Sequence, residues 1–437
     1  MKKTIARICV LVLTALCLML TFGACESRDE VLKIYNWGEY MDPEVYEDFS
    51  QWYFDKTGKT VTVKYKEFDT NESMYTEIAV NKSDYDLVCP SDYMVQRMIR
   101  EGLVLELDKE IFKADDDLYY EGLRELIEES FDPGLKYTVP YVWGTFGIMY
   151  DSSEPVDPED MQSWEAMFSE KYSGHILMKN SARDAYSVAQ IYNNADVLSE
   201  KSSGFTDYGA EYKTVLSDIF SSTDADKIAA ASKTLSAQKK VLRRYEVDDG
   251  KDDMLSGGTG SWLGFFWSCD AGYVMNDTEI EGSGCAGEQI IPGNKNLRYV
   301  VPKEGSNVWV DCFVIPKYAK NPTAANYFLE YLCTAEYGED DPEFEDYETV
   351  AEKNTDWLGA STAVKTAMDN MRAYYEEEQE NRDDEESFFY GTADDFYDMY
   401  IDMMFPSPET LSRCAIMKDF GRFNFELDGM WIDVKTS

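Results

Sequence analysis

Short apolar runs alternate with segments of helical spacing between residues 31 and 102. The segment after Asp42-Pro43 has an N-cap residue, a proline at the first helical position and an apolar face, and it stops at Gly58. Strands are predicted over 31–35, 59–68 and 85–89, with helices over 43–57, 71–81 and from the 90–93 loop to 102. A strand-helix-strand-helix-strand order predicts a largely parallel sheet covered on both faces, and hence an α/β protein.

The chain then repeats this pattern with longer strands. Residues 137–150 predict a strand that crosses into a second unit, and 299–316 predict two strands around a glycine-containing turn at 303–307. Further strands are predicted over 172–179 and 262–269, and helices over much of 185–242 and over 321–333. The acidic tracts 339–348 and 376–386 are interpreted as solvated or disordered.

The N-terminus has the pattern of a secretion signal. Lys2, Lys3 and Arg7 precede the apolar segment 8–22, which is too short for a membrane span. Small residues before Cys25 resemble a bacterial lipoprotein cleavage site, which predicts lipid modification of Cys25 and a tether to a membrane. A plain signal peptide is the alternative. The predicted location is extracytoplasmic, on the outer face of the cytoplasmic membrane or in the periplasm.

The formal net charge of −43 restricts the partners. Nucleic-acid binders are basic, so nucleic acid is excluded as a partner, and cationic ligands are favoured. The chain has one histidine and no cysteine spacing typical of zinc, so neither a metal nor another cofactor is expected. Export permits disulfides, but spacing does not decide their pairing.

Aromatic residues follow four predicted strand ends, and three of the four groups include a carboxylate. In parallel sheets, ligands bind beyond the carboxyl ends of the strands. An indole face attracts an organic cation, and a carboxylate accepts its N–H bonds, as a linear polyamine requires. Any single pair also fits a core tryptophan beside a surface acid, so the prediction depends on the recurrence. The groups are Trp37 with Glu39 and Tyr40, Tyr93, Trp267 with Asp270, and Trp309 with Asp311, and Asp184 adds an acid at a helix start.

The chain resembles the spermidine/putrescine-binding proteins of ABC-type polyamine importers over about residues 31–335. The matching segments are YNWGEY at 35–40, YDLVCPSDY at 85–93, VPYVWG at 139–144, VPKEG at 301–305 and WVD at 309–311. The resemblance implies a type II, periplasmic-binding-protein-like fold of two α/β lobes that close over a ligand in the cleft between them. It also implies a monomer without enzymatic activity, which delivers the ligand to the permease and ATPase subunits of an importer.

By the same resemblance, each candidate residue receives a role. Aromatic walls would come from Trp37, Tyr40, Tyr93, Trp267 and Trp309; amine ligands would be Asp184, Asp270 and Asp311; Ser91 and Glu39 would add polar contacts. The family's spermidine-binding members have an acid at the position of Ser181, whereas Asp270 resembles the putrescine-binding members. Putrescine is therefore slightly favoured over spermidine.

The expected domain organisation follows from the crossing strands. The ranges are 1–24 for the signal, 31–140 and 310–370 for the first lobe, and 141–309 and 371–437 for the second lobe, with the acidic insertion in the last range. Two other functions remain open at this stage. One is the same fold with a sugar or amino acid as ligand; the other is a secreted hydrolase that uses paired carboxylates.

Overall fold

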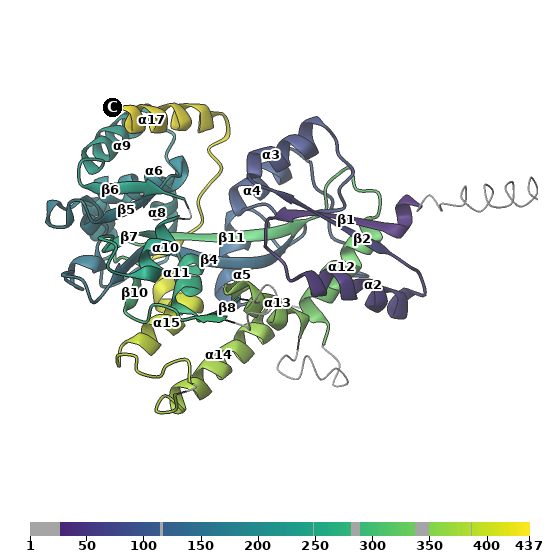
Figure 1. Ribbon diagram of the computed structural model, residues 1–437. Coiled ribbons are helices and arrows are strands. Elements are labelled where there is room, and N and C mark those ends of the chain that lie inside the picture. Colours follow the sequence, from purple (N-terminus) through teal and green to yellow (C-terminus); the bar gives the residue numbers. More distant parts are fainter. Residues whose placement is uncertain (1–26, 114–116, 248, 281–288, 337–348, 386) are drawn as a thin grey trace, which may run out of the picture.

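Two α/β lobes lie side by side in the computed structural model and are joined by two long strands (Figure 1). The structure describes residues 27–113, 117–247, 249–280, 289–336, 349–385 and 387–437. The main sheet has the strand order β2-β1-β3-β11-β4-β7-β5-β6, so that each lobe contributes one end of it. Cys25, the predicted site of lipid modification, lies outside the described residues.

The first lobe is built around β1 (Val31–Trp37), which is parallel to β2 (Thr62–Phe68) and β3 (Leu87–Val88). Helix α2 (Pro43–Thr57) begins as predicted, because Asp42 accepts a hydrogen bond from the amide of Glu44, and it ends at Gly58 with φ 68°. The other helices of this lobe are α3 (Asn71–Tyr75), α4 (Asp92–Arg100), α5 (Glu121–Ser130), α12 (Pro322–Thr334) and α13 (Val350–Leu358).

Strands β4 (Thr138–Asp151) and β11 (Ser306–Val314) connect the lobes and run antiparallel to each other. All 14 residues of β4 are buried, which fits a strand enclosed on both faces. Strand β10 (Leu297–Val300) pairs with the far end of β4, so β10 and β11 lie in line along one partner. The boundaries predicted at 140/141 and 309/310 fall inside these two connecting strands, and the lobe ranges themselves stay a prediction.

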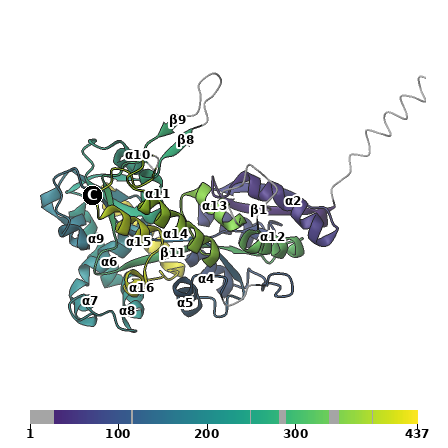
Figure 2. The ribbon, with the colours of Figure 1, turned by 90° about the horizontal axis from the view of Figure 1, so that it is seen from below.

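The second lobe places β7 (Leu263–Trp267) antiparallel to β4, with β5 (Ile176–Lys179) and β6 (Leu242–Glu246) beyond it. Its helices are α6 (Ala182–Asn193), α7 (Ala195–Lys201), α8 (Tyr212–Phe220), α9 (Ala225–Gln238), α10 (Asp249–Ser256) and α11 (Ser268–Met275). Strands β8 (Thr278–Ile280) and β9 (Gln289–Ile291) form a hairpin that projects beside α10 and α11 (Figure 2).

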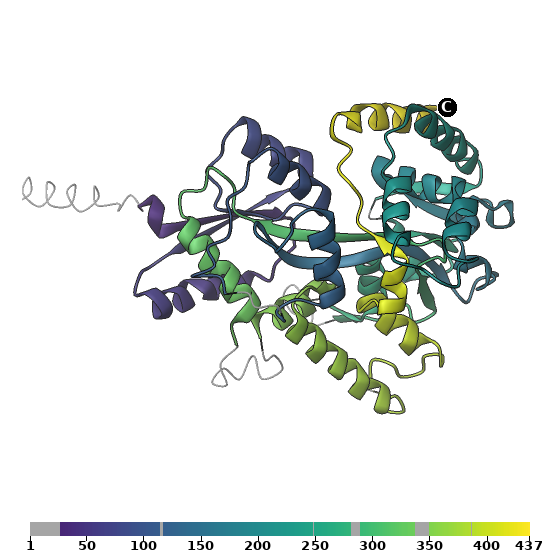
Figure 3. The ribbon, with the colours of Figure 1, turned by 180° about the vertical axis from the view of Figure 1, so that it is seen from behind.

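The C-terminal part returns to the second lobe, where α15 packs on β10 and α17 packs on α9 (Figure 3). Its elements are β12 (Ser361–Thr362), α14 (Lys365–Glu380), α15 (Phe396–Met404), α16 (Pro408–Ser412), β13 (Cys414–Ala415) and α17 (Asn424–Thr436). The interpretation of 376–386 as solvated or disordered holds as solvated, because Glu376, Glu377 and Glu380 are exposed. Its first part is nevertheless ordered: 376–380 continue α14, and Glu378 accepts a hydrogen bond from the amide of Phe388. The tract 339–348 lies outside the described residues.

Within the described ranges, no helix combines the length and the apolar character needed to cross a bilayer. The five described cysteines, Cys89, Cys269, Cys312, Cys333 and Cys414, are free thiols, and four of them are buried. The four buried thiols belong to one hydrophobic core and Cys269 packs against it, so they behave as packing residues.

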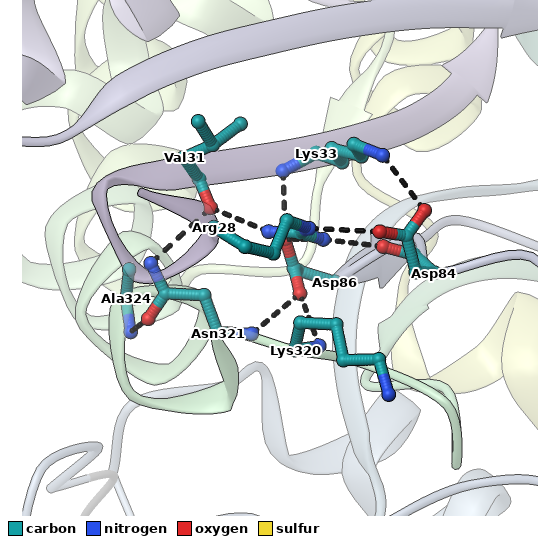
Figure 4. A network of polar contacts seen from close by, with 8 residues as sticks. All are labelled: Arg28, Val31, Lys33, Asp84, Asp86, Lys320, Asn321 and Ala324. Atoms are coloured by element: carbon teal, nitrogen blue, oxygen red, sulfur yellow. Dashed lines mark hydrogen bonds and ion pairs between the residues drawn. The ribbon is translucent and has the colours of Figure 1, made fainter. Parts of the chain in front are cut away.

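Asp86 ties three segments of the first lobe together (Figure 4). Its carboxylate is fully buried and accepts hydrogen bonds from the amides of Lys33, Lys320 and Asn321, at 2.9, 2.8 and 2.7 Å. The Arg28 guanidinium supplies the compensating charge, with Nη2 2.8 Å from Oδ2. The network joins β1 and the approach to β3 with the connection from β11 to α12.

Asp86→Asn is expected to lower the free energy of unfolding by about 3–5 kcal/mol, because an amide nitrogen would face buried donors and Arg28 would lose one of its two carboxylate partners. Urea unfolding measures this change. The matched control is Asp84→Asn, whose side chain is 38% exposed, and which should cost about 1 kcal/mol or less. Equal losses in the two variants would contradict the role of Asp86.

Candidate functional site

Asp311 is a buried carboxylate on the connecting strand β11. Its side chain accepts a hydrogen bond from the Tyr40 hydroxyl at 2.8 Å, and only 7% of the residue is exposed. Within the described part of the chain, no Lys or Arg lies within ion-pair distance of it. Burial raises the pKa of Asp311 to about 6, although hydrogen bonds from Ser91 and Tyr40 oppose the shift.

Two loops of the first lobe hold these hydrogen-bond donors. The Tyr40 carbonyl accepts the Tyr141 hydroxyl at 2.8 Å, which fixes the turn after β1 against β4. Ser91 exchanges two hydrogen bonds of 3.1 Å with Asn71 and forms an isolated bridge with Asp311. The site is therefore assembled from the ends of β1 and β3 and the start of α4, as the strand-end rule predicts.

Asp92 is a second buried acid beside this group, and the sequence analysis did not select it. It is 3% exposed, and Oδ2 accepts the amide of Val310 at 3.3 Å. Burial raises its pKa to about 7, while the Arg183 charge opposes the shift. Its position between Ser91 and Tyr93 was the only signal in the sequence that could have identified it.

Trp309 lies two residues before Asp311, opposite Gly144 of β4. Its indole nitrogen donates to the Thr145 carbonyl at 3.2 Å, and its side chain is partly exposed. A Cβ atom on Gly144 would lie 2.9 Å from the indole Cζ2 and 2.2 Å from the Ser268 hydroxyl. The absence of a side chain at Gly144 therefore makes room for the indole.

Tyr93 contacts the second lobe instead of facing open space. The Arg183 guanidinium lies 3.8 Å from the Tyr93 ring centre and 4.6 Å from that of Phe420, so it is held between two aromatic rings. Arg183 comes from α6 of the second lobe, and Tyr93 from α4 of the first.

Helix α4 makes further contacts across the two lobes. Gln96 exchanges hydrogen bonds with the Met417 carbonyl at 2.9 Å and the Asp419 amide at 3.1 Å, and Arg100 pairs with Asp419 at 2.6 Å. The lobes therefore touch along α4.

Trp267 and Asp270 form a second group, and a lysine occupies it. Lys179 Nζ lies 2.9 Å from Asp270 Oδ2, 3.3 Å from Glu246 Oε1 and 4.5 Å from the Trp267 ring centre. Its side chain is 1% exposed. The carboxylate predicted to bind a ligand amine thus has a partner within the protein.

Within the described residues, no hydrogen bond or ion pair joins the three remaining candidates to either group. Trp37 packs on Phe68, with ring centres 4.5 Å apart, and Glu39 is exposed in a turn with φ 49°. Asp184 is partly buried in the first turn of α6, where its amide donates to Ser181 Oγ at 3.3 Å. Burial raises the pKa of Asp184, and the Ser181 hydroxyl and the charges of Arg183 and Lys179 oppose the shift.

The structure thus unites Tyr40, Ser91 and Asp311 by hydrogen bonds, with Trp309 next to them. The residues that the sequence analysis missed are Asn71, Asp92, Lys179 and Arg183. Lys179 lies at the end of a predicted strand, which is where ligand-binding residues were expected. The rest of that strand is apolar, and nothing in the sequence indicated that its lysine would lie beside Trp267 and Asp270.

The described residues do not assemble the metal, histidine or thiol groups that many hydrolases use. No group of three or more His, Cys, Asp or Glu residues there is placed to hold a metal ion. His175 stacks on Trp262 at 3.5 Å, with Nδ1 2.7 Å from the Gly260 carbonyl, so it is held by packing away from the candidate acids. Burial raises the pKa of the Cys89 and Cys269 thiols, which makes both poor nucleophiles.

The model of a protein family described as bacterial extracellular solute-binding protein matches residues 45–340. A spermidine/putrescine-binding periplasmic protein of Salmonella typhimurium is 27% identical over 311 residues, which cover 71% of this chain and 74% of the relative. The putrescine-binding periplasmic protein PotF of Escherichia coli is 27% identical over 315 residues, which cover 71% and 75%.

The solved structures are similar over the whole fold. A spermidine/putrescine ABC transporter substrate-binding protein of Streptococcus pneumoniae has a TM-score of 0.63 at 24% identity and covers 93% of this chain and 99% of its own. The Tp0655 lipoprotein of Treponema pallidum has a TM-score of 0.62 at 20% identity, over 93% and 100%. These matches confirm the predicted two-lobed, periplasmic-binding-protein-like fold.

Gly144→Ala is expected to displace the Trp309 indole and to lower the free energy of unfolding by about 1–3 kcal/mol, because the added methyl group overlaps Ser268 and the ring. Urea unfolding followed by tryptophan fluorescence measures both effects. The control is Gly429→Ala in α17, where no atom lies within 4 Å of the new Cβ and a gain of about 0.5–1 kcal/mol is expected. A Gly144 variant as stable as wild type would contradict this packing.

Proposed function

Because the chain belongs to the bacterial extracellular solute-binding protein family, we propose that it binds a polyamine between its lobes and delivers it to an ABC importer. The relatives named above bind putrescine or spermidine according to their names, which supports this ligand class. The partners in this proposal are the membrane permease and its ATPase, and the binding protein itself acts as a monomer without catalysis.

The single observation that carries the proposal is the buried Asp311 carboxylate without a cationic partner in the described chain. A buried carboxylate is costly unless a charge or several hydrogen bonds compensate it. Only two hydroxyl groups, of Tyr40 and Ser91, oppose the rise of its pKa. An ammonium group supplied by a ligand would provide the missing charge, and the neighbouring Trp309 indole would contact its methylenes.

The lobes provide the means of enclosing such a ligand. In proteins of two lobes joined by strands, ligands are commonly captured by hinge closure. The contacts of Arg183 with Tyr93, and of Asp419 with Gln96 and Arg100, hold the lobes together on one side. These contacts would have to break when the lobes open.

A sugar or an amino acid is the second candidate ligand, and no specific contact favours it. A sugar would favour planar polar groups such as Asn and Arg, whereas the neighbouring Asp92 adds a second acid beside Asp311. The carboxylate of an amino acid would be repelled by both acids.

The proposed location is the outer face of the cytoplasmic membrane, through lipid modification of Cys25. The support is the sequence around Cys25 together with the family's extracellular character. Cell fractionation tests it: Cys25→Ser should move the protein to the soluble fraction, and an unchanged membrane fraction would contradict the anchor.

Asp311→Asn is expected to weaken putrescine binding about a hundredfold or more, since removing one partner of a buried charge pair costs about 3–5 kcal/mol. Calorimetry on the purified protein measures the dissociation constant. The matched control is Asp207→Asn, an exposed acid of the second lobe, which should bind like wild type. Equal affinities of wild type and Asp311→Asn would contradict the assignment of this site.

The same titrations at several pH values give a second readout. The raised pKa of Asp311, about 6, means that the carboxyl must lose its proton before it can pair with an ammonium group. Polyamine nitrogens stay protonated in this range, as lysine does. Affinity should therefore rise about tenfold from pH 5 to pH 7, and Asp311→Asn should remove the part of this rise due to Asp311.

The stability of the ligand-free protein depends on pH in the opposite direction: the contribution of these acids falls as the pH rises. A carboxyl with a raised pKa binds more protons in the folded state than in the unfolded state between about pH 4 and the folded value. The contribution of Asp311 and Asp92 to stability, with pKa values of about 6 and 7, is thus present at low pH and lost as the pH rises through these values.

A further inference from the structure

Lys179 has the surroundings that a ligand ammonium would need. Two carboxylates, of Asp270 and Glu246, lie 2.9 and 3.3 Å from its Nζ atom, and the Val247 carbonyl accepts a hydrogen bond from it. The aromatic rings of Trp267 and Phe266 lie 4.5 and 5.6 Å away. These are the same group types that the sequence predicts for one amine of a polyamine.

This lysine is a fixed part of the protein. Its side chain is 1% exposed, and that of Glu246 is fully buried. Moving Lys179 away would leave Glu246 and Asp270 without a cation in the described part of the site, which is strongly unfavourable. The two carboxylates raise the pKa of Lys179 against the effect of burial, so the group stays charged.

Unlike Asp270, the other predicted acids form no ion pair with a lysine or arginine of the described chain. Neither Asp184 nor Asp311 has an ion pair with a described Lys or Arg, and Glu39 is exposed to solvent. Of the acids predicted from the sequence, two partly or fully buried carboxylates therefore remain for a ligand, one from each lobe. Asp184 begins α6 of the second lobe, and Asp311 lies on β11 beside the first.

We propose that Lys179 is a built-in ammonium that occupies one amine subsite and thereby makes the protein select a diamine over a triamine. This inference rests on the proposed function. In this account Asp270 holds Lys179 instead of the ligand, and the two ammonium groups of a diamine pair with Asp184 and Asp311. A triamine would bring a third ammonium to a region where Lys179 already supplies the positive charge, and the two would repel each other.

The alternative is that the three charges are only a structural link between β5, β6 and α11. The two accounts differ in their effect on selectivity. A structural link affects stability and the affinity for both amines alike, whereas a built-in ammonium affects the ratio of the two dissociation constants.

Calorimetry with putrescine and spermidine on Lys179→Met provides the test, with Lys59→Met, an exposed lysine of the first lobe, as the matched control. Removing the built-in charge should shift the ratio of dissociation constants at least about tenfold in favour of spermidine, a change of about 1.4 kcal/mol. The control should keep the wild-type ratio. A ratio unchanged in Lys179→Met would overturn the inference.

Asp270→Asn keeps the lysine paired with Glu246 and serves if Lys179→Met does not fold. The expected change in putrescine affinity is less than about threefold, because the Asp270 carboxylate does not touch the ligand in this account. A loss of about a hundredfold, as expected for Asp311→Asn, would show that Asp270 binds the ligand and would overturn the inference. A wild-type protein that binds neither amine would overturn the proposed function itself, whereas unchanged selectivity in a protein that binds both overturns only the role of Lys179.

Discussion

The burial of one uncompensated carboxylate is the constraint on which the functional part of the structure depends. Asp311 lies on a strand that connects both lobes, so its position is fixed by pairing with β4. Burial raises the pKa values of both Asp311 and Asp92; hydroxyl groups oppose the rise at Asp311, and the Arg183 charge and backbone amides oppose it at Asp92. A protein that only needed stability would gain by replacing such an acid with an apolar residue. In the proposed function, a cation that arrives from outside the chain explains the presence of Asp311.

The second lobe also contains buried carboxylates, but there the chain itself supplies the compensating positive charge. At the end of β5, Lys179 supplies the cation for Asp270 and Glu246 from within the chain. At the start of α6, Arg183 lies between two aromatic rings and joins the lobes. The same chemistry, a cation beside an aromatic ring and a carboxylate, thus serves both internal cohesion and the proposed ligand binding. The difference is whether the chain itself provides the positive charge.

Much of the fold could be predicted from the sequence, because strands and helices in the first lobe follow clear apolar periods and caps such as Asp42 and Gly58. The C-terminal helices α14, α15 and α17 were not predicted, since their faces are decided by tertiary packing: α14 packs on α13 and β12, α15 on β10 and α11, and α17 on α9. The same holds for the site: Asp311, Tyr40 and Ser91 were found from strand ends and from the resemblance. Lys179 and Arg183 were missed, because spacing along the chain does not show which charge will lie against which ring.

The most direct test of the account is the number of protons released when putrescine binds at pH 6, measured by calorimetry in buffers of different ionisation enthalpy. With a pKa of about 6, the Asp311 carboxyl is about half protonated in the free protein, and an ammonium partner should displace that proton. The account predicts release of about half a proton or more at pH 6 and much less at pH 8. Absence of binding, or binding at pH 6 without any proton release, would contradict it.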